Sequence, residues 1–309
     1  MRLGNPGGDI RRRHDIKRER EVMKGFKAFN KGMICLGKQY AENTVFEEPE
    51  AIVCQKGMHF CKNPFDVLDY YPLIDDNGEF SEFAEVEALD EPVTDDNKKF
   101  CSKKLKIGAK LSFANFIKAA ASFEFEKTEN DKKTNIVENS GNSVKIGSSG
   151  YYAKIGSSGY YAQIGSSGYS AQIGSSGDSA KIGSSGYSAQ IGSSGDSAKI
   201  GSSGDYAKIG SSGNYAQIGS SGDCAQIGSS GNSAKITSEG KYAVICCAGY
   251  DSIAKGKIGS WITLSEWKYS DIEDANIPVC VKTEKIDGVK IKADTFYKLV
   301  NGEFVEVKL

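Results

Sequence analysis

The chain has 309 residues, enough for two domains or three small ones with a buried core. Its 39 Lys and Arg nearly balance its 40 Asp and Glu, and a net charge of −1 argues against a protein that mainly coats nucleic acid or an acidic membrane. Glycine is abundant and proline scarce, which excludes collagen and indicates many tight turns, and no apolar run reaches the ~18 residues of a membrane span.

Cysteine usage indicates a reducing compartment. The eight cysteines are scattered along a long chain at irregular spacings, and no secretory signal pattern follows the first methionine. A disulfide framework is typical of short secreted chains. We therefore expect reduced thiols in a cytoplasmic protein.

Residues 1–22 differ from the rest of the chain because basic residues dominate and no apolar pattern is present. A basic arm for nucleic acid is one interpretation, but no aromatic residue interleaves the basic run. We interpret the segment as a disordered leader, with Met23 as a candidate start.

Residues 23–128 predict a small α+β domain of short strands joined by glycine turns. Asn63 and Pro64 predict a helix start, since Asn caps a first turn and Pro fits the first helical position. Residues 80–89 alternate like a half-buried strand, and residues 111–127 predict the last helix of the domain.

From residue 143 to 250 the chain is a nine-residue repeat: isoleucine recurs from Ile146 to Ile245, and alanine precedes it by two residues. Each unit divides into a Gly-Ser-Ser-Gly turn and an extended segment such as Tyr169–Ile173. Alternation along a strand places Ala and Ile on one face and the intervening Lys or Gln on the other. One segment cannot bury its Ile alone, so stacking predicts a β-solenoid.

Two segments per coil are favoured because residues 169–186 recur unchanged at 187–204, a repeat of 18 residues. A three-sided coil of 27 residues is the alternative. The two-sided coil predicts six coils with Ile and Ala columns inside. The fold class is then mainly β: a small α+β N-terminal domain, a central β-solenoid of nonapeptide repeats with about 18 residues per coil, and a C-terminal β-hairpin cap.

The last 59 residues predict a cap for the solenoid. Trp261 and Trp267 are expected to cover the open core. Asp287-Gly288 and Asn301-Gly302 are hairpin signals, which predict an antiparallel meander over residues 279–309. The predicted division is a leader (1–22), an α+β domain (23–128), a linker (129–142), the solenoid (143–250), and a cap with meander (251–309).

Residues that could carry chemistry are few. Cys35, Cys54, His59 and Cys61 are soft metal ligands, but the usual Cys-x2–4-Cys knuckle is absent. Calcium-binding nonapeptides place Asp two residues after a turn Gly, whereas Asp follows Gly directly here. We expect neither a metal nor a cofactor. The candidate catalytic residues are His59, Tyr40 and Glu87.

Tyrosine is concentrated in the first half of the repeat. Tyrosine offers a large, rigid contact area at small entropic cost, which suits protein binding. The alternative is that these rings only pack between coils. The candidate binding residues are Tyr151, Tyr152, Tyr160, Tyr161, Tyr169 and Tyr187, with Gln172 and Gln190.

Three motifs carry a resemblance to a known family. They are Gly25-Phe26-x-x-Phe29-Asn30-Lys31, Gly57-x-His59-x-Cys61-x-Asn63-Pro64-x-Asp66, and Gly259-Ser260-Trp261-Ile262 followed by Glu266-Trp267. With the tail at residues 287–307, they resemble an uncharacterised family of phage and prophage proteins. The resemblance implies a viral or mobile-element origin and a host-cell location, and it brings no activity with it. Residues 1–22 fall outside it.

We favour a non-enzymatic, phage-encoded interaction protein whose solenoid is a rigid scaffold and docking surface. Its expected partner is a host or phage protein, with a host defence complex as one target, and a homo-oligomer is also considered. One alternative is an enzyme acting on nucleotides or ADP-ribose through His59, because residues 57–71 are similar to a strand–helix element of ADP-ribosyltransferase-like folds. A second alternative is a structural component of the virion.

Overall fold

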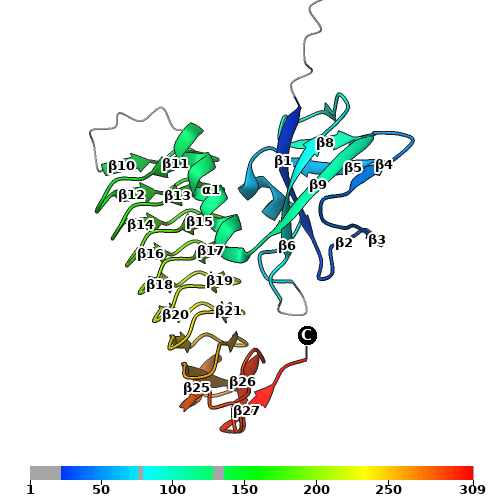
Figure 1. Ribbon diagram of the computed structural model, residues 1–309. Coiled ribbons are helices and arrows are strands. Elements are labelled where there is room, and N and C mark those ends of the chain that lie inside the picture. The colour runs from blue at the N-terminus through cyan, green and yellow to red at the C-terminus, as the bar shows by residue number, and fades with distance from the viewer. Residues whose placement is uncertain (1–21, 76–78, 128–135, 309) are drawn as a thin grey trace, which may run out of the picture.

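The computed structural model describes residues 22–75, 79–127 and 136–308. These residues form an N-terminal domain, a ladder of stacked coils beside it, and a C-terminal cap at the far end of the ladder (Figure 1). The predicted leader, apart from Val22, and the linker up to residue 135 lie outside the described residues.

The N-terminal domain is built on one antiparallel sheet with the strand order β4-β9-β6-β1-β5-β8-β7. A small ribbon of β2 (Ile34–Cys35) and β3 (Lys38–Gln39) lies beside it. The sheet consists of β1 (Met23–Phe29), β4 (Val45–Glu47), β5 (Met58–Cys61), β6 (Glu82–Ala88), β7 (Val93–Thr94), β8 (Lys99–Ser102) and β9 (Lys104–Leu111).

The two faces of this sheet bury different clusters, as strand alternation requires. One face packs Phe29, Phe60 and Val86 into the core of the domain. The other packs Phe83 against the 3₁₀ helix η1 (Pro64–Asp69) and α1 (Phe113–Lys127), where the Phe83 and Phe116 rings stack 3.7 Å apart. The helix start predicted at Asn63 is present, since its side-chain oxygen accepts a hydrogen bond from Phe65 N at 3.0 Å.

The predicted β-solenoid is confirmed: in the described part of the chain it makes about seven turns, roughly 18 residues apart, over residues 136–264. Parallel pairing joins identical positions of successive coils, such as Ile173 with Ile191. The stack therefore begins before the predicted residue 143 and ends after residue 250. It begins earlier because β10 pairs with β12 in register, although the sequence there lacks the Gly-Ser repeat.

Each coil contributes one strand to each of two sheets, which we call the exposed sheet and the covered sheet. The exposed sheet contains β10 (Ile136–Asn139), β12 (Lys154–Ser157), β14 (Gln172–Ser175), β16 (Gln190–Ser193), β18 (Lys208–Ser211), β20 (Gln226–Ser229), β22 (Val244–Cys247), β24 (Trp261–Ser270) and β25 (Ala275–Lys285). The covered sheet contains β11 (Lys145–Ser148), β13 (Gln163–Ser166), β15 (Lys181–Ser184), β17 (Lys199–Ser202), β19 (Gln217–Ser220), β21 (Lys235–Ser238), β23 (Ile253–Lys255), β26 (Tyr297–Val300) and β27 (Glu303–Glu306).

The expectation that Gly-Ser-Ser-Gly forms the turn is wrong. The first Gly and Ser are strand residues, so a strand reads Lys/Gln-Ile-Gly-Ser, with Ile and Ser inside and Lys/Gln and Gly outside. The turn follows, and its left-handed residue is Ser170 (φ 53°). Gly168, at the corner, is required for another reason: a Cβ there would lie 2.0 Å from the carbonyl oxygen of Gly150 in the preceding coil.

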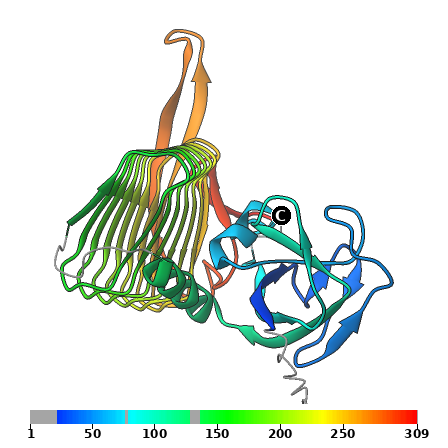
Figure 2. The same cartoon turned by 90° about the horizontal axis from the view of Figure 1, so that it is seen from above.

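The C-terminal cap consists of two hairpins, but residues 279–309 do not form one meander. Asn301-Gly302 joins β26 to β27 as expected. Asp287-Gly288 forms a turn in which Gly288 N donates to Ile291 O, but the strands on its two sides belong to different sheets. The hairpin of β24 and β25 instead turns near Asp274 and extends beyond the outline of the coils (Figure 2).

The expectation that the two tryptophans cover the open core is also wrong. Trp261 is 47% exposed, and Trp267 is held at the side of the stack, where its Nε1 donates to Ala248 O at 2.9 Å. The end of the core is instead covered by the aliphatic and aromatic residues Ile286, Ile291, Tyr297 and Leu299. Within the described ranges, no helix is long and apolar enough to cross a membrane.

Candidate interaction surfaces

The outer side of the covered sheet is buried by the N-terminal domain (Figure 2), and α1 lies across β11 to β17 (Figure 1). Glycine makes this close packing possible. A Cβ on Gly165 would lie 2.7 Å from Ala121 Cα, and one on Gly201 would lie 2.3 Å from Ile117 Cδ1. The glycine column therefore serves as a track for the helix.

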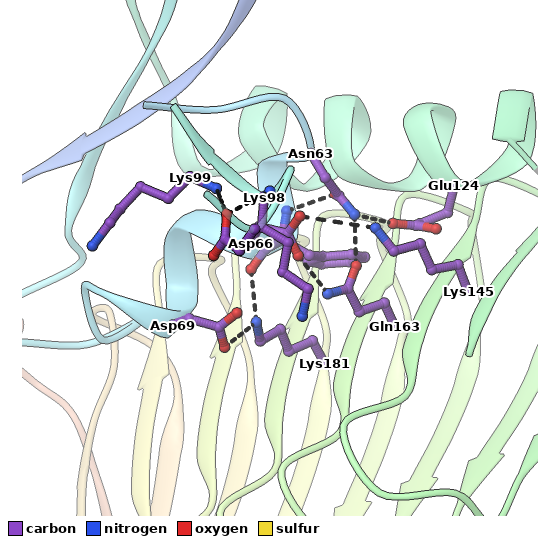
Figure 3. Close-up of polar contacts among 11 residues, drawn as sticks. Asn63, Asp66, Asp69, Lys98, Lys99, Glu124, Lys145, Gln163 and Lys181 are labelled. Carbon is purple, nitrogen blue, oxygen red and sulfur yellow. Dashed lines mark hydrogen bonds and ion pairs between the residues drawn. The ribbon is translucent and has the colours of Figure 1, made fainter. Parts of the chain in front are cut away.

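The polar column beside that track is engaged by η1 and α1 (Figure 3). Asn63 Nδ2 donates to Glu124 Oε1 and to Gln163 Oε1, both at 2.6 Å, and Gln163 Nε2 donates to Asp66 Oδ1 at 2.8 Å. Burial raises the pKa of Glu124 to about 7, although the hydrogen bond from Asn63 favours the ionised form. These hydrogen bonds form a buried polar network that joins the N-terminal domain to the covered sheet.

Two lysines of the covered sheet bind η1 directly. Lys181 Nζ forms an ion pair with Asp69 at 2.5 Å and donates to Phe65 O at 3.0 Å, and its side chain is only 5% exposed. Lys199 Nζ donates to Leu68 O at 2.5 Å, and burial lowers the pKa of Lys199 to about 8. These lysines recognise the carboxylate and carbonyl oxygens that a short helix presents.

The predicted tyrosine surface is divided between the two edges of the stack. On the edge that follows the covered strands, which we call the tyrosine edge, Tyr169 and Tyr187 stack at 5.2 Å with 12° between their planes. The ring of Tyr151 lies 6.2 Å from that of Tyr169, and the ring of Tyr206, which the sequence prediction did not include, lies 5.2 Å from that of Tyr187. We define the tyrosine edge as the continuous group Tyr151, Tyr152, Tyr169, Tyr187 and Tyr206; Tyr242 lies on the same side two coils further along.

Tyr160 and Tyr161 lie on the opposite edge, 53% and 58% exposed. That edge is otherwise a ladder of Asp and Asn side chains that hydrogen-bond the next coil; Asp196 Oδ1, for example, accepts from Asn214 N at 2.7 Å. Gln172 and Gln190 lie on neither edge. They are outward-facing residues of the exposed sheet, paired in register.

The three candidate catalytic residues lie in different environments. His59 is on β5, where its Nε2 accepts a hydrogen bond from Cys54 N at 2.9 Å and burial lowers its pKa. Tyr40 is buried in the cluster that contains Val86 and Ala88, and burial raises its pKa. Glu87 lies between Val86 and Ala88 on β6, so its side chain points to the opposite face of the sheet. There it forms ion pairs with Lys24 and Lys106. The sheet thus separates Tyr40 from Glu87.

A buried lysine that the sequence reasoning missed lies in the same domain. Lys27 Nζ donates to Cys35 Sγ at 3.3 Å and to His59 O at 2.9 Å, and burial lowers its pKa. Tyr71 Oη donates to the same sulfur at 3.0 Å. Lys27, Cys35 and Tyr40 are each less than 9% exposed, so the cluster is closed to a substrate and braces the sheet. The only sequence signal was a lysine at a position where β1 is apolar.

The soft ligands considered for zinc do not converge. Cys61 faces the cluster of Phe65 and Ala28, and burial raises its pKa to about 12, which keeps the thiol protonated. Cys54 is exposed at a left-handed backbone position (φ 62°). In the described ranges no three His, Cys, Asp or Glu side chains gather as metal ligands would.

Comparison with known proteins identifies one part of the chain. Residues 23–119 match a domain of unknown function, DUF7666. The match begins at β1 and ends within α1, so the repeats and the cap lie outside it. No curated protein and no solved structure matches the chain. The DUF7666 region therefore provides η1 and the first part of the helix that covers the solenoid, while the rest of α1, including Ala121 and Glu124, follows it.

Proposed function

We propose that this chain is a non-enzymatic interaction protein in which a rigid solenoid, braced by the DUF7666 region, presents the tyrosine edge to a partner protein. The observation that carries the proposal is the stacking of Tyr169 on Tyr187 while both rings stay more than 40% exposed. Rings that are already ordered lose little side-chain entropy on binding, so less of the free energy gained from their apolar area is lost to ordering.

The setting we propose is the cytoplasm of a host cell, with the protein encoded by a phage and a host defence complex as its target. The resemblance of the N-terminal and C-terminal motifs to phage and prophage proteins supports this setting. The closed environment of Lys27 and the separation of Tyr40 from Glu87 favour a binding role over catalysis.

The test compares two triple variants in quantitative affinity capture from host lysate. Tyr151→Ala/Tyr169→Ala/Tyr187→Ala removes the tyrosine edge, and Tyr160→Ala/Tyr161→Ala/Tyr215→Ala removes as many exposed rings from the opposite edge. We expect the first variant to fold and lose the partner, and the second to retain it. Recovery of the same proteins by both variants would rule out the tyrosine edge. Loss of biological potency in His59→Ala with unchanged capture would instead favour an enzyme.

A further inference from the structure

The two sheets of the solenoid carry the same outward pattern, but the residues that the structure describes cover the outer side of only one of them. On the exposed sheet a shallow groove of about 840 Å³ runs along the stack. A Cβ built on Gly174, Gly192 or Gly210 would meet no atom within 4 Å, so the floor of the groove is bare backbone. The groove is lined by the glycine column 156, 174, 192, 210 and 228 and by Lys154, Gln172, Gln190, Lys208 and Gln226.

The covered sheet shows what this pattern binds within the same chain. There the glycine column takes α1, with Ala121 and Ile117 in the track, while the Lys and Gln column binds carboxylates and carbonyl oxygens. Two further lysines of the covered sheet form ion pairs with carboxylates: Lys145 with Asp66 at 3.8 Å, and Lys255 with Glu79 at 3.3 Å. On the covered sheet these two contacts are divided, since α1 fills the glycine track and the carboxylates come from η1 and the residues after it. A single helix with small and aliphatic contact residues and carboxylates on one flank would meet both columns at once.

The polar side chains that line the exposed groove are not paired with other described residues. Lys154 and Lys208 are exposed, and neither forms an ion pair with any residue in the described ranges. The side-chain amides of Gln172 and Gln190 likewise form no hydrogen bond with any residue in the described ranges. At the equivalent positions of the covered sheet, Lys181 and Lys199 instead bind oxygen atoms of η1.

We propose that the exposed sheet is a second docking site, which binds an amphipathic helix of a partner protein with small and aliphatic residues along its contact stripe and carboxylates on one flank. The site is separate from the tyrosine edge and does not depend on it.

Geometry favours a helix over other occupants. The backbone groups of these strands already pair with the coils above and below, so a partner strand cannot add to this face by hydrogen bonding. Five glycines in successive coils span about 19 Å at ~4.8 Å per coil, which matches about 13 helical residues at ~1.5 Å each. A second copy packed face to face would oppose Lys154 and Lys208 with like charges.

The test uses the helix this chain already places on the equivalent track. A fluorescent peptide with the sequence of residues 113–127, FANFIKAAASFEFEK, is titrated into the full-length protein and followed by anisotropy. We expect saturable binding at one peptide per chain that weakens with salt. Gly174→Leu/Gly192→Leu fills the groove from two positions where an added Cβ would meet no atom within 4 Å, and should weaken binding at least tenfold.

Two further variants keep the result interpretable. Lys154→Glu/Lys208→Glu changes only exposed side chains and should also weaken binding, while the Tyr151/Tyr169/Tyr187 triple alanine variant should bind the peptide normally. Circular dichroism confirms that each variant keeps its strand content.

Absence of binding to the wild type would overturn the proposal, as would binding unchanged by both groove variants, because the peptide would then exchange with α1 at the covered sheet. A dimer in sedimentation velocity that Gly174→Leu/Gly192→Leu abolishes would identify a second copy as the occupant and overturn the helix.

Discussion

The two solenoid sheets share one sequence pattern and have opposite environments. In the strand β14 of the exposed sheet, burial alternates, and Gln172 and Gly174 face outward. In the neighbouring β13 every residue is buried, including Gln163 and Gly165, because η1 with its cap and α1 lie on them. A residue such as Lys or Gln therefore has no fixed role in this repeat. Its role is decided by what lies opposite, and the predictions below test that difference.

The largest expected effect comes from the glycine columns. Gly165→Val should lower the free energy of unfolding by about 3 kcal/mol, because the side chain would meet the backbone of α1 at Ala121. Gly174→Val, one strand away on the exposed sheet, should change it by less than ~0.5 kcal/mol. Urea denaturation of both variants measures the contrast. Equal losses would mean that glycine is needed for the strand itself rather than for the helix.

The second prediction concerns the pH dependence of the covered sheet. The pKa of Glu124 is raised by burial to about 7, so between pH 4.5 and 7 the folded state binds a proton that the unfolded state does not. Stability should therefore fall as pH rises through this window, by roughly 2–3 kcal/mol relative to Glu124→Gln, at ~1.4 kcal/mol per pKa unit. Denaturation midpoints of both proteins from pH 4.5 to 8 provide the measurement. Parallel curves would show that this carboxyl is not titrating in the fold.

The third prediction compares two lysines at equivalent positions in the repeat. Lys181→Met removes the ion pair with Asp69 and the hydrogen bond to Phe65 O, and should lower stability by about 1–2 kcal/mol. Lys208→Met removes no side-chain hydrogen bond or ion pair with any described residue and should stay within ~0.5 kcal/mol. Thermal unfolding of the two variants measures the difference in stability. A larger loss of stability in Lys208→Met than in Lys181→Met would contradict the assignment of the covered and exposed sheets.

The smallest effect is expected at the edge opposite the tyrosines. Asp196→Ala removes the oxygen that accepts Asn214 N and should cost at most ~1 kcal/mol, since the site is exposed to water. Asp196→Asn keeps that acceptor, as Asn214 itself does one coil later, and should be nearly neutral. Hydrogen exchange at the Asn214 amide reports the local change. Equal exchange in all three proteins would show that the ladder does not stabilise the turn.

The repeat could be predicted in outline but not in register. The spacing of Ile and Ala placed these columns inside, and the 18-residue duplication selected the two-strand coil. The strand boundaries were misplaced because Gly and Ser are common turn residues. In the stack, Gly165 and Ser166 are strand residues whose propensity is overridden by pairing with the coils on either side.

The candidate surfaces were predictable only in part. An 18-residue spacing places Tyr151, Tyr169 and Tyr187 together, but Tyr160 lies nine residues away and so falls on the other edge. Nothing local could have paired Lys181 with Asp69, which is 112 residues away. Lys27 was missed for the same reason, since its partner oxygen at His59 belongs to another strand.

The amino-acid sequence by itself determined the solenoid, because short segments with a nine-residue period of Ile and Ala can bury these side chains only by stacking, and the same packing repeats from coil to coil. Only the tertiary structure decided which of the two equivalent sheets is covered. The reason is that both sheets carry the same outward glycine track, while the chain path brings α1 and η1 to one of them, and the described residues leave the other uncovered.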